Sequence, residues 1–207
     1  MDRKEAIRTR TIPFVFSDES RDTYGTVLSA DKWDLKRFNR IGVAFYNHNG
    51  RSSDPDQTIG TAKARVEGKK LVGEITFENG DINPIAEKIF QKVLNGTLRC
   101  VSVGFMPLER GKFGEGEEAL GGKNETYYYG RCELLEISVT PMPSNKNAMV
   151  RSVGVDPMGE NIERMSVEGE IENIEQDTDG DVNENRDDDR ARMLNLMVRS
   201  AFAMAHY

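Results

Sequence analysis

The feature that most constrains the fold is a series of short runs rich in β-branched and aromatic residues within the first 150 residues. Runs of this kind are typical of β-strands. Glu67 and Gly68 separate two of them and predict a hairpin turn. So many short strands in one segment favour a mainly β barrel or sandwich. The runs cover residues 11–16, 25–29, 41–46, 58–66, 70–77, 98–108 and 127–140.

Two helices are predicted beside these strands. The clearer one starts after Asn83, because asparagine is a favoured N-cap and Pro84 suits the first helical position. Asn95 and Gly96 end it, as glycine commonly does after a helix. A second, shorter helix is predicted over residues 31–40. The expected fold class is therefore α+β, mainly β with flanking helices.

The composition changes near residue 150, which divides the chain into three parts. Residues 1–150 form the expected folded domain. Residues 151–189 are acidic and contain no aromatic residue, so they predict a largely disordered linker. Apolar residues in 190–207 recur with helical spacing and predict an amphipathic helix. Two roles for that helix stay open: packing back on the domain, or docking on a partner.

Charge and cysteine content exclude several classes of function. The chain has 28 basic and 35 acidic residues, and its net charge of −7 argues against nucleic-acid binding without sequence preference and against anionic membranes. No apolar run approaches the ~20 residues that span a bilayer, and no secretory signal is visible. Cys100 and Cys132 are too few for a disulfide framework or a zinc cluster. We expect a protein of a reducing compartment that uses no metal or other cofactor.

Histidine usage limits the chemistry that the domain can perform. The chain has only His48 and His206, and His206 is the penultimate residue. Any mechanism that needs an imidazole in the folded domain therefore depends on His48. It lies where the apolar run 41–46 meets a polar loop, and strand ends commonly present reactive groups. Taken by itself, a histidine at this position is more often an ordinary surface-loop residue.

Ser102 lies within an apolar strand. Period-two alternation places it on one face with Cys100 and Gly104, whereas the valines beside it point to the other face. A face made of small residues either packs against nearby backbone or is open to a ligand. Ser102 is therefore a candidate nucleophile, although a serine in a strand is also a tolerated small residue.

Glu136 interrupts the apolar run 134–139. An unpaired buried carboxylate is unfavourable, so Glu136 needs a partner or a solvated edge. Orienting a histidine is one such partnership, as in nucleophile, base and orienting-group sets. Glu133 is a weaker rival, because it lies nearer the start of the strand.

The order and wording of these motifs resemble the prohead (head-maturation) proteases of tailed bacteriophages. The resemblance extends over about residues 10–150, and only the region 21–25 follows it loosely. The histidine motif and the serine motif together are specific, whereas neither is specific by itself. The matching stretches are Trp33-Asp34 through Phe38, Tyr46-Asn47-His48-Asn49, Ile59-Gly60-Thr61-Ala62, Gly96-Thr97-Leu98, Val101-Ser102-Val103-Gly104-Phe105, Leu134 through Pro141, and Pro143-Ser144-Asn145.

The resemblance implies a nucleophilic Ser102, a general base His48 and, as third member, Glu136. It also implies the closed β-barrel with flanking helices of herpesvirus assembly proteases, whose third member is a second histidine. The folded part of this chain has no second histidine, so its third member must be acidic. Arg110 and Arg131 are both candidates to stabilise the oxyanion, and the sequence does not choose between them.

The activity implied is that of a serine endopeptidase of capsid maturation, acting inside assembling proheads in the host cytoplasm and not secreted. Its expected substrates and partners are the capsid protein with its scaffolding region, the scaffold protein and further copies of itself. We expect a homo-oligomer without nucleic-acid or membrane partners. The acidic tail then acts as a removable element that carries the enzyme into the shell. The alternative is a non-catalytic β-barrel assembly factor, although such a factor has no need of Ser102, His48 and Glu136.

Overall fold

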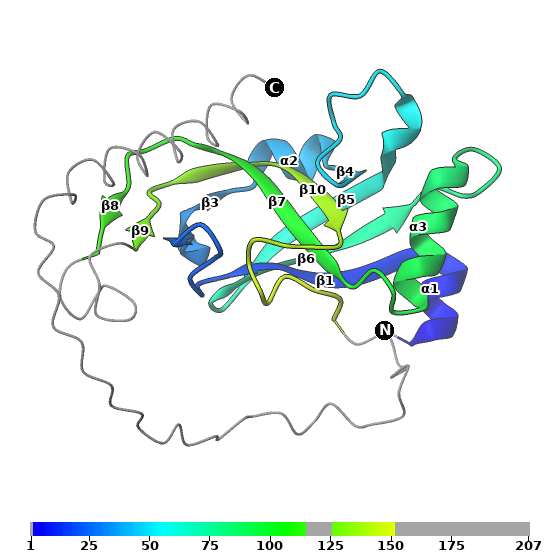
Figure 1. Cartoon of the computed structure of the whole chain (residues 1–207), viewed down its shortest axis with the longest axis horizontal. Coiled ribbons are helices and arrows are strands. Elements are labelled where there is room, and N and C mark those ends of the chain that lie inside the picture. Colours follow the sequence, from blue (N-terminus) through cyan, green and yellow to red (C-terminus); the bar gives the residue numbers. More distant parts are fainter. Residues whose placement is uncertain (1, 115–125, 152–207) are drawn as a thin grey trace, which may run out of the picture.

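The structure is a computed structural model that describes residues 2–114 and 126–151 (Figure 1). Its larger sheet contains β1 (Thr11–Asp18), β3 (Trp33–Asp34), β4 (Val43–Tyr46), β5 (Thr58–Glu67), β6 (Lys70–Phe77), β7 (Cys100–Pro107) and β10 (Cys132–Thr140). A small second sheet contains β2 (Thr26–Val27), β8 (Lys112–Phe113) and β9 (Tyr127–Tyr128). The helices are α1 (Arg3–Thr9), α2 (Lys36–Ile41) and α3 (Pro84–Leu94), with short 3-10 turns at Ala30–Lys32 and Pro55–Gln57.

The larger sheet is a curled half-barrel, so the prediction of a closed barrel is wrong. Neighbouring strands run in the order β1, β6, β5, β4, β10, and β7 pairs with the other side of β10. No ladder joins β1 to β7 in the described residues. The extended segment 148–151 lies between them and bonds both edges, but only through the isolated bridges Phe14–Val150 and Cys100–Met149. Because this segment occupies the gap, the two edge strands cannot pair directly.

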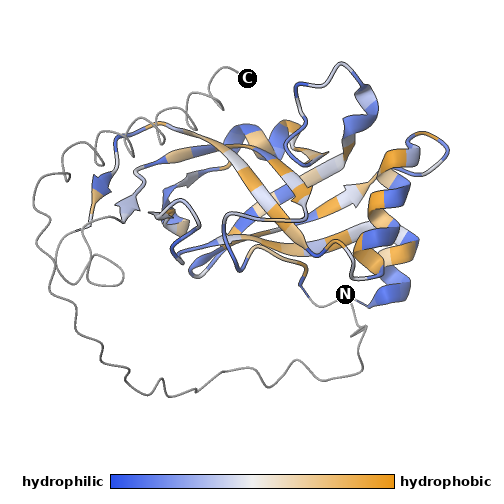
Figure 2. Ribbon diagram, viewed as in Figure 1, coloured by the Kyte–Doolittle hydropathy of each residue, from blue (hydrophilic) through white to orange (hydrophobic). Residues whose placement is uncertain are grey.

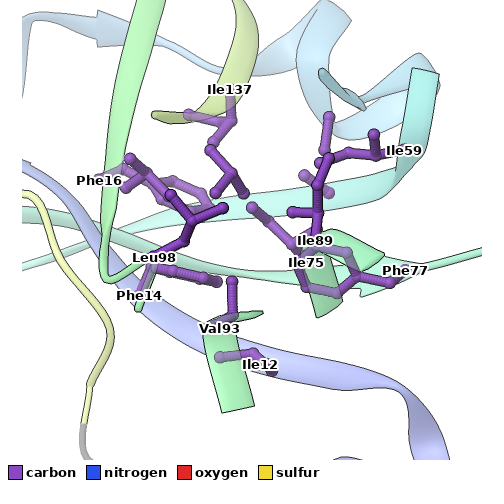
Figure 3. Close-up of a cluster of buried hydrophobic side chains, with 14 of the residues drawn as sticks. Ile12, Phe14, Phe16, Ile59, Ile75, Phe77, Ile89, Val93, Leu98 and Ile137 are labelled. Atoms are coloured by element: carbon purple, nitrogen blue, oxygen red, sulfur yellow. The ribbon is translucent and has the colours of Figure 1, made fainter. Parts of the chain in front are cut away.

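The hydrophobic core lies between the curled sheet and α3. Ile89 and Val93 of α3 reach toward Phe14 of β1, Ile75 of β6 and Ile137 of β10 (Figure 3). Colouring by hydropathy shows the apolar stripe of α3 and the alternation along the strands (Figure 2). Since one face of β7 and β10 is committed to this core, the residues between their core positions point to the outer face.

Helix α3 confirms the sequence prediction, because the Asn83 side chain accepts a hydrogen bond from the Ala86 backbone N–H at 2.9 Å. The hairpin between β5 and β6 is also confirmed. The predicted helix over 31–40 is only partly right, because Trp33–Asp34 pair with β10 and α2 begins at Lys36. Helix α1 was not anticipated from the sequence.

A turn after β10 returns the chain to β1. Asn145 is buried, and its side-chain amide donates to the carboxylate of Asp18 at 3.0 Å. Burial raises the pKa of Asp18, but hydrogen bonds from Ser20, Asn145 and Asn147 outweigh it and leave that pKa below its usual value. The turn is thereby fixed to β1, which directs the following residues into the gap between β1 and β7.

The predicted linker (151–189, except its first residue) and terminal helix (190–207) lie outside the described residues. None of the helices in the described ranges is long and apolar enough to cross a membrane.

Candidate active site

The outer face of β7 and β10 carries a row of polar and small residues. Ser102 lies opposite Ser138 in the antiparallel ladder, and Gly104 lies opposite Glu136. Paired residues in such a ladder place their side chains on the same face at short distance. The structure therefore places Ser102 and Glu136, which are far apart in sequence, on one small patch of the sheet.

A β-bulge turns Glu136 to this outer face. The β7–β10 register shifts between Leu134 and Glu136, so Leu135 is an extra residue. Leu134 and Ile137 are both fully buried in the core, three residues apart, which strict alternation does not allow. A bulge resolves the conflict and re-aims the next side chain, a common arrangement beside active sites. Glu136 thus leaves the core that its apolar neighbours fill.

His48 reaches the same face from the end of β4. Asn47 and His48 have φ values of 53° and 57°, in the left-handed region that non-glycine residues rarely adopt. The turn is held by hydrogen bonds, since the Asn47 N–H donates to the Val139 carbonyl at 2.9 Å and the Thr140 hydroxyl donates to the Asn47 side-chain oxygen at 3.2 Å. Left-handed residues held in this way concentrate at functional sites.

His48 and Glu136 are in direct contact. Nδ1 of His48 lies 2.6 Å from Oε1 of Glu136, with side-chain exposures of 37% for His48 and 17% for Glu136. Because a carboxylate only accepts hydrogen bonds, Nδ1 carries the proton, and Nε2 of a neutral ring is then the acceptor. The exposure of His48 leaves its ring accessible from solvent. The pair therefore presents Nε2 of His48 as a hydrogen-bond acceptor on a ring that a half-buried carboxylate holds.

The two serines of the patch differ in their hydrogen bonds. The Ser138 hydroxyl donates to Oε2 of Glu136 at 2.8 Å and accepts from the His48 N–H at 3.0 Å. The Ser102 hydroxyl has no hydrogen-bond partner among residues 2–114 and 126–151, and the residue as a whole is 8% exposed. Ser138 is fully buried and its hydroxyl is already bonded, whereas the Ser102 hydroxyl carries no such bond.

Gly104 leaves the space that Glu136 occupies. A Cβ atom at position 104 would lie 2.2 Å from Oε1 of Glu136 and 2.8 Å from its Cδ. Real Cβ contacts are never this short. A glycine here is thus a requirement of the carboxylate position, and not of the backbone conformation.

Other candidate groups do not fit the site. Burial raises the pKa of Cys100, which shares the face of Ser102, and it raises that of Cys132 to about 12, so both thiols stay protonated at neutral pH. The rival carboxylate Glu133 lies 3.5 Å from Arg37 on the far side of the bulge.

Neither predicted oxyanion arginine lies near Ser102. Arg131 directly precedes Cys132, the first residue of β10. Cys132 is six residues before Ser138, the residue opposite Ser102, and six residues of strand are ~20 Å long. Arg131 is also engaged with Asp34 at 2.6 Å. Arg110 follows the same end of β7. Both candidates are therefore excluded as oxyanion donors in this arrangement.

Sequence reasoning missed Ser138 and the purpose of Gly104. Ser138 belongs to an apolar strand and was assigned no role from the sequence, because only the ladder register places it beside Ser102. Its one sequence signal is its spacing two residues after Glu136, which predicts a shared face.

An open hollow lies beside the His48 turn, lined by Tyr46, Asn47, Asn49, Gln57 and Ile85.

Of the comparisons with known proteins, the one with protein families finds a match. No curated protein and no solved structure matches the chain significantly. A family model described as caudovirus prohead serine protease matches residues 30–163, which is more than half of the chain and includes Ser102, His48 and Glu136. The chain belongs to the caudovirus prohead serine protease family.

Proposed function

We propose that the protein is an active serine endopeptidase in which Ser102 is the nucleophile, His48 the general base and Glu136 the orienting carboxylate. The observation that carries this proposal is the 2.6 Å contact between His48 and Glu136 on the face where Ser102 has a free hydroxyl. This set has the nucleophile, base and orienting group that peptide hydrolysis requires.

In the proposed reaction, Nε2 of His48 takes the proton of Ser102 as its oxygen attacks a peptide carbonyl. The ring is then positively charged, and Glu136 stabilises that charge through Nδ1. His48 next gives the proton to the leaving amine, which departs and leaves an acyl group on Ser102. Water, deprotonated by the same histidine, releases the acyl group and restores the serine.

We propose that the substrates are the scaffolding region of the capsid protein, the scaffold protein and the enzyme itself, cleaved inside the prohead. The family supports capsid maturation as the setting. A non-catalytic assembly factor is less well supported, because two consecutive left-handed residues cost about 1–2 kcal/mol each and an assembly factor gains nothing from them.

Covalent labelling tests the reaction class. A fluorophosphonate probe added to the purified full-length protein is expected to modify Ser102, because the probe reacts with serines activated by a base. Mass spectrometry of the digested protein identifies the modified residue. The buried and hydrogen-bonded Ser138 serves as an internal control and is expected to stay unmodified. Labelling that is absent, or that survives in His48→Ala at the same rate, contradicts the proposal.

A pair of truncations tests the tail as a targeting element. A chain that ends at Arg151 is expected to keep its fold and its cleavage of a peptide substrate, but not to be packaged into proheads. A chain that ends at Asn147 is expected to lose about 4 kcal/mol or more of stability, since it lacks four backbone hydrogen bonds made by 148–151 to β1 and to the 99–101 stretch.

Thermal unfolding, peptide cleavage and prohead composition measure the three effects. Normal packaging of the chain that ends at Arg151 contradicts the targeting role. Equal thermal stability of the two truncated chains contradicts the role of the bridging segment.

A further inference from the structure

We propose that Ser138 is a positioning residue that holds His48 and Glu136 in register for catalysis. The inference rests on the proposed function, because it assigns a role relative to that site. The Ser138 hydroxyl makes no hydrogen bond to the Ser102 hydroxyl and takes no part in the proposed proton transfers. It acts through the two residues that it bonds.

The hydrogen bonds of Ser138 join the side chain of one site residue to the backbone of the other. Its hydroxyl has a single proton, which goes to Oε2 of Glu136 at 2.8 Å. One of its lone pairs receives the His48 N–H at 3.0 Å. A single buried atom thereby links the orienting carboxylate to the backbone of the base.

The two oxygens of Glu136 have separate partners as a result. Oε2 bonds Ser138, which leaves Oε1 directed at Nδ1 of His48. Rotation of the carboxylate about its last bond would break both contacts together. The Ser138 bond therefore fixes the orientation of Glu136 as well as its place.

The bond to the His48 N–H has a second effect. His48 is held in the left-handed region at φ 57°, where the backbone of a non-glycine residue needs support from its surroundings. The neighbouring Asn47 is bonded to β10 through its own N–H. Ser138 extends this support to the next residue and so fixes the backbone position from which the His48 imidazole extends.

Position on the ladder makes this arrangement specific to Ser138. It is opposite Ser102, two residues from Glu136, and fully buried. A small apolar residue would fill the same space without satisfying either polar group. Because buried polar groups without partners are unfavourable, the carboxylate and the His48 turn would shift toward water.

The test compares Ser138→Ala with a matched control. Ser17→Ala removes another buried serine, 2% exposed, from β1 and outside the site. We expect Ser138→Ala to lower kcat by about 10- to 100-fold with KM little changed, as misplacement of a catalytic group by ~1 Å does. Ser17→Ala is expected to leave kcat unchanged. Ser138→Thr, which keeps the hydroxyl, is expected to restore most of the rate.

A double-mutant cycle separates positioning from general stability. If Ser138 acts through Glu136, adding Ser138→Ala to Glu136→Ala lowers kcat much less than it does in the wild type. Equal losses in both backgrounds would overturn the proposal. So would a wild-type kcat in Ser138→Ala. Should the alanine variant fail to fold, Ser138→Cys keeps the size with a weak donor, and the same loss is expected.

A spectroscopic readout keeps this test independent of the proposed function. The full-length chain has only two histidines, so His206→Ala leaves His48 as the sole source of imidazole proton signals. The short Nδ1 contact predicts a far-downfield proton resonance, and Ser138→Ala is expected to shift it upfield or broaden it. An unchanged resonance overturns the positioning role. An inactive wild-type protein with the expected shift overturns the proposed function and leaves the positioning role standing.

Discussion

Replacing Ser102 with alanine is expected to abolish cleavage when the protein is expressed together with the capsid and scaffold proteins of its phage. Loss of the nucleophile of a serine protease removes about 10⁴-fold or more of the rate, because the remaining groups only bind and polarise the substrate. The Ser102 variant is expected to fold normally, since the Ser102 side chain makes no hydrogen bond within the described ranges. Gel analysis of the co-expressed proteins measures the effect.

His48→Ala is the partner experiment for this first prediction. Nucleophile and base act as a unit, so the double variant is expected to be about as slow as either single variant. Intact scaffold in both variants, with cleavage by the wild type, would support the assignment. Continued cleavage by Ser102→Ala would refute it, and wild-type protein that cleaves neither partner would refute the proposed substrates.

Replacing Gly104 with alanine is expected to lower kcat by about 100-fold or more while the fold persists. The added Cβ would overlap Oε1 of Glu136, at 2.2 Å, so the carboxylate must leave its place beside His48. The flexible Glu136 side chain can move at little cost in stability. Without it, however, the His48 imidazole is no longer held in the required tautomer and orientation. Peptide cleavage and thermal unfolding, measured on the same sample, separate the two effects.

Gly73→Ala is the contrasting control. A Cβ at position 73 would lie 2.0 Å from the Lys63 backbone carbonyl and 2.3 Å from the Phe16 ring, neither of which can move freely. This variant is expected to lose stability, whereas Gly104→Ala is expected to lose activity. If Gly104→Ala keeps wild-type kcat, Glu136 is not needed where the structure places it.

Local sequence patterns anticipated much of the fold. Most of the runs of β-branched residues coincide with strands, although β3 and β8 lie outside them and the run 127–140 contains two strands, β9 and β10. The Asn83 cap located α3, because such a signal depends only on neighbouring residues. The small-residue face of β7 also followed from simple alternation. His48 was singled out by the scarcity of histidine, which needs no structure to see.

The missed features depend on contacts between distant parts of the chain. The gap between β1 and β7 results from the segment 148–151. No local sequence pattern predicts the extended path of this segment. The bulge at Leu135 changes which face Glu136 occupies, and a bulge is defined by the partner strand. For the same reason, Ser138 emerged only when the register placed it opposite Ser102.

The bridging segment, residues 148–151, also determines when the fold can be completed during synthesis of the chain. The Val15 N–H donates to the Met149 carbonyl, so β1 cannot complete its hydrogen bonds until a residue 134 positions later has been synthesised. A nascent chain that has not yet released this segment from the ribosome leaves both edge strands open. Native pairings between such distant residues form late in folding. The core of the folded domain is therefore completed only near the end of the translation of that domain, after Ser102 and His48 have already been synthesised.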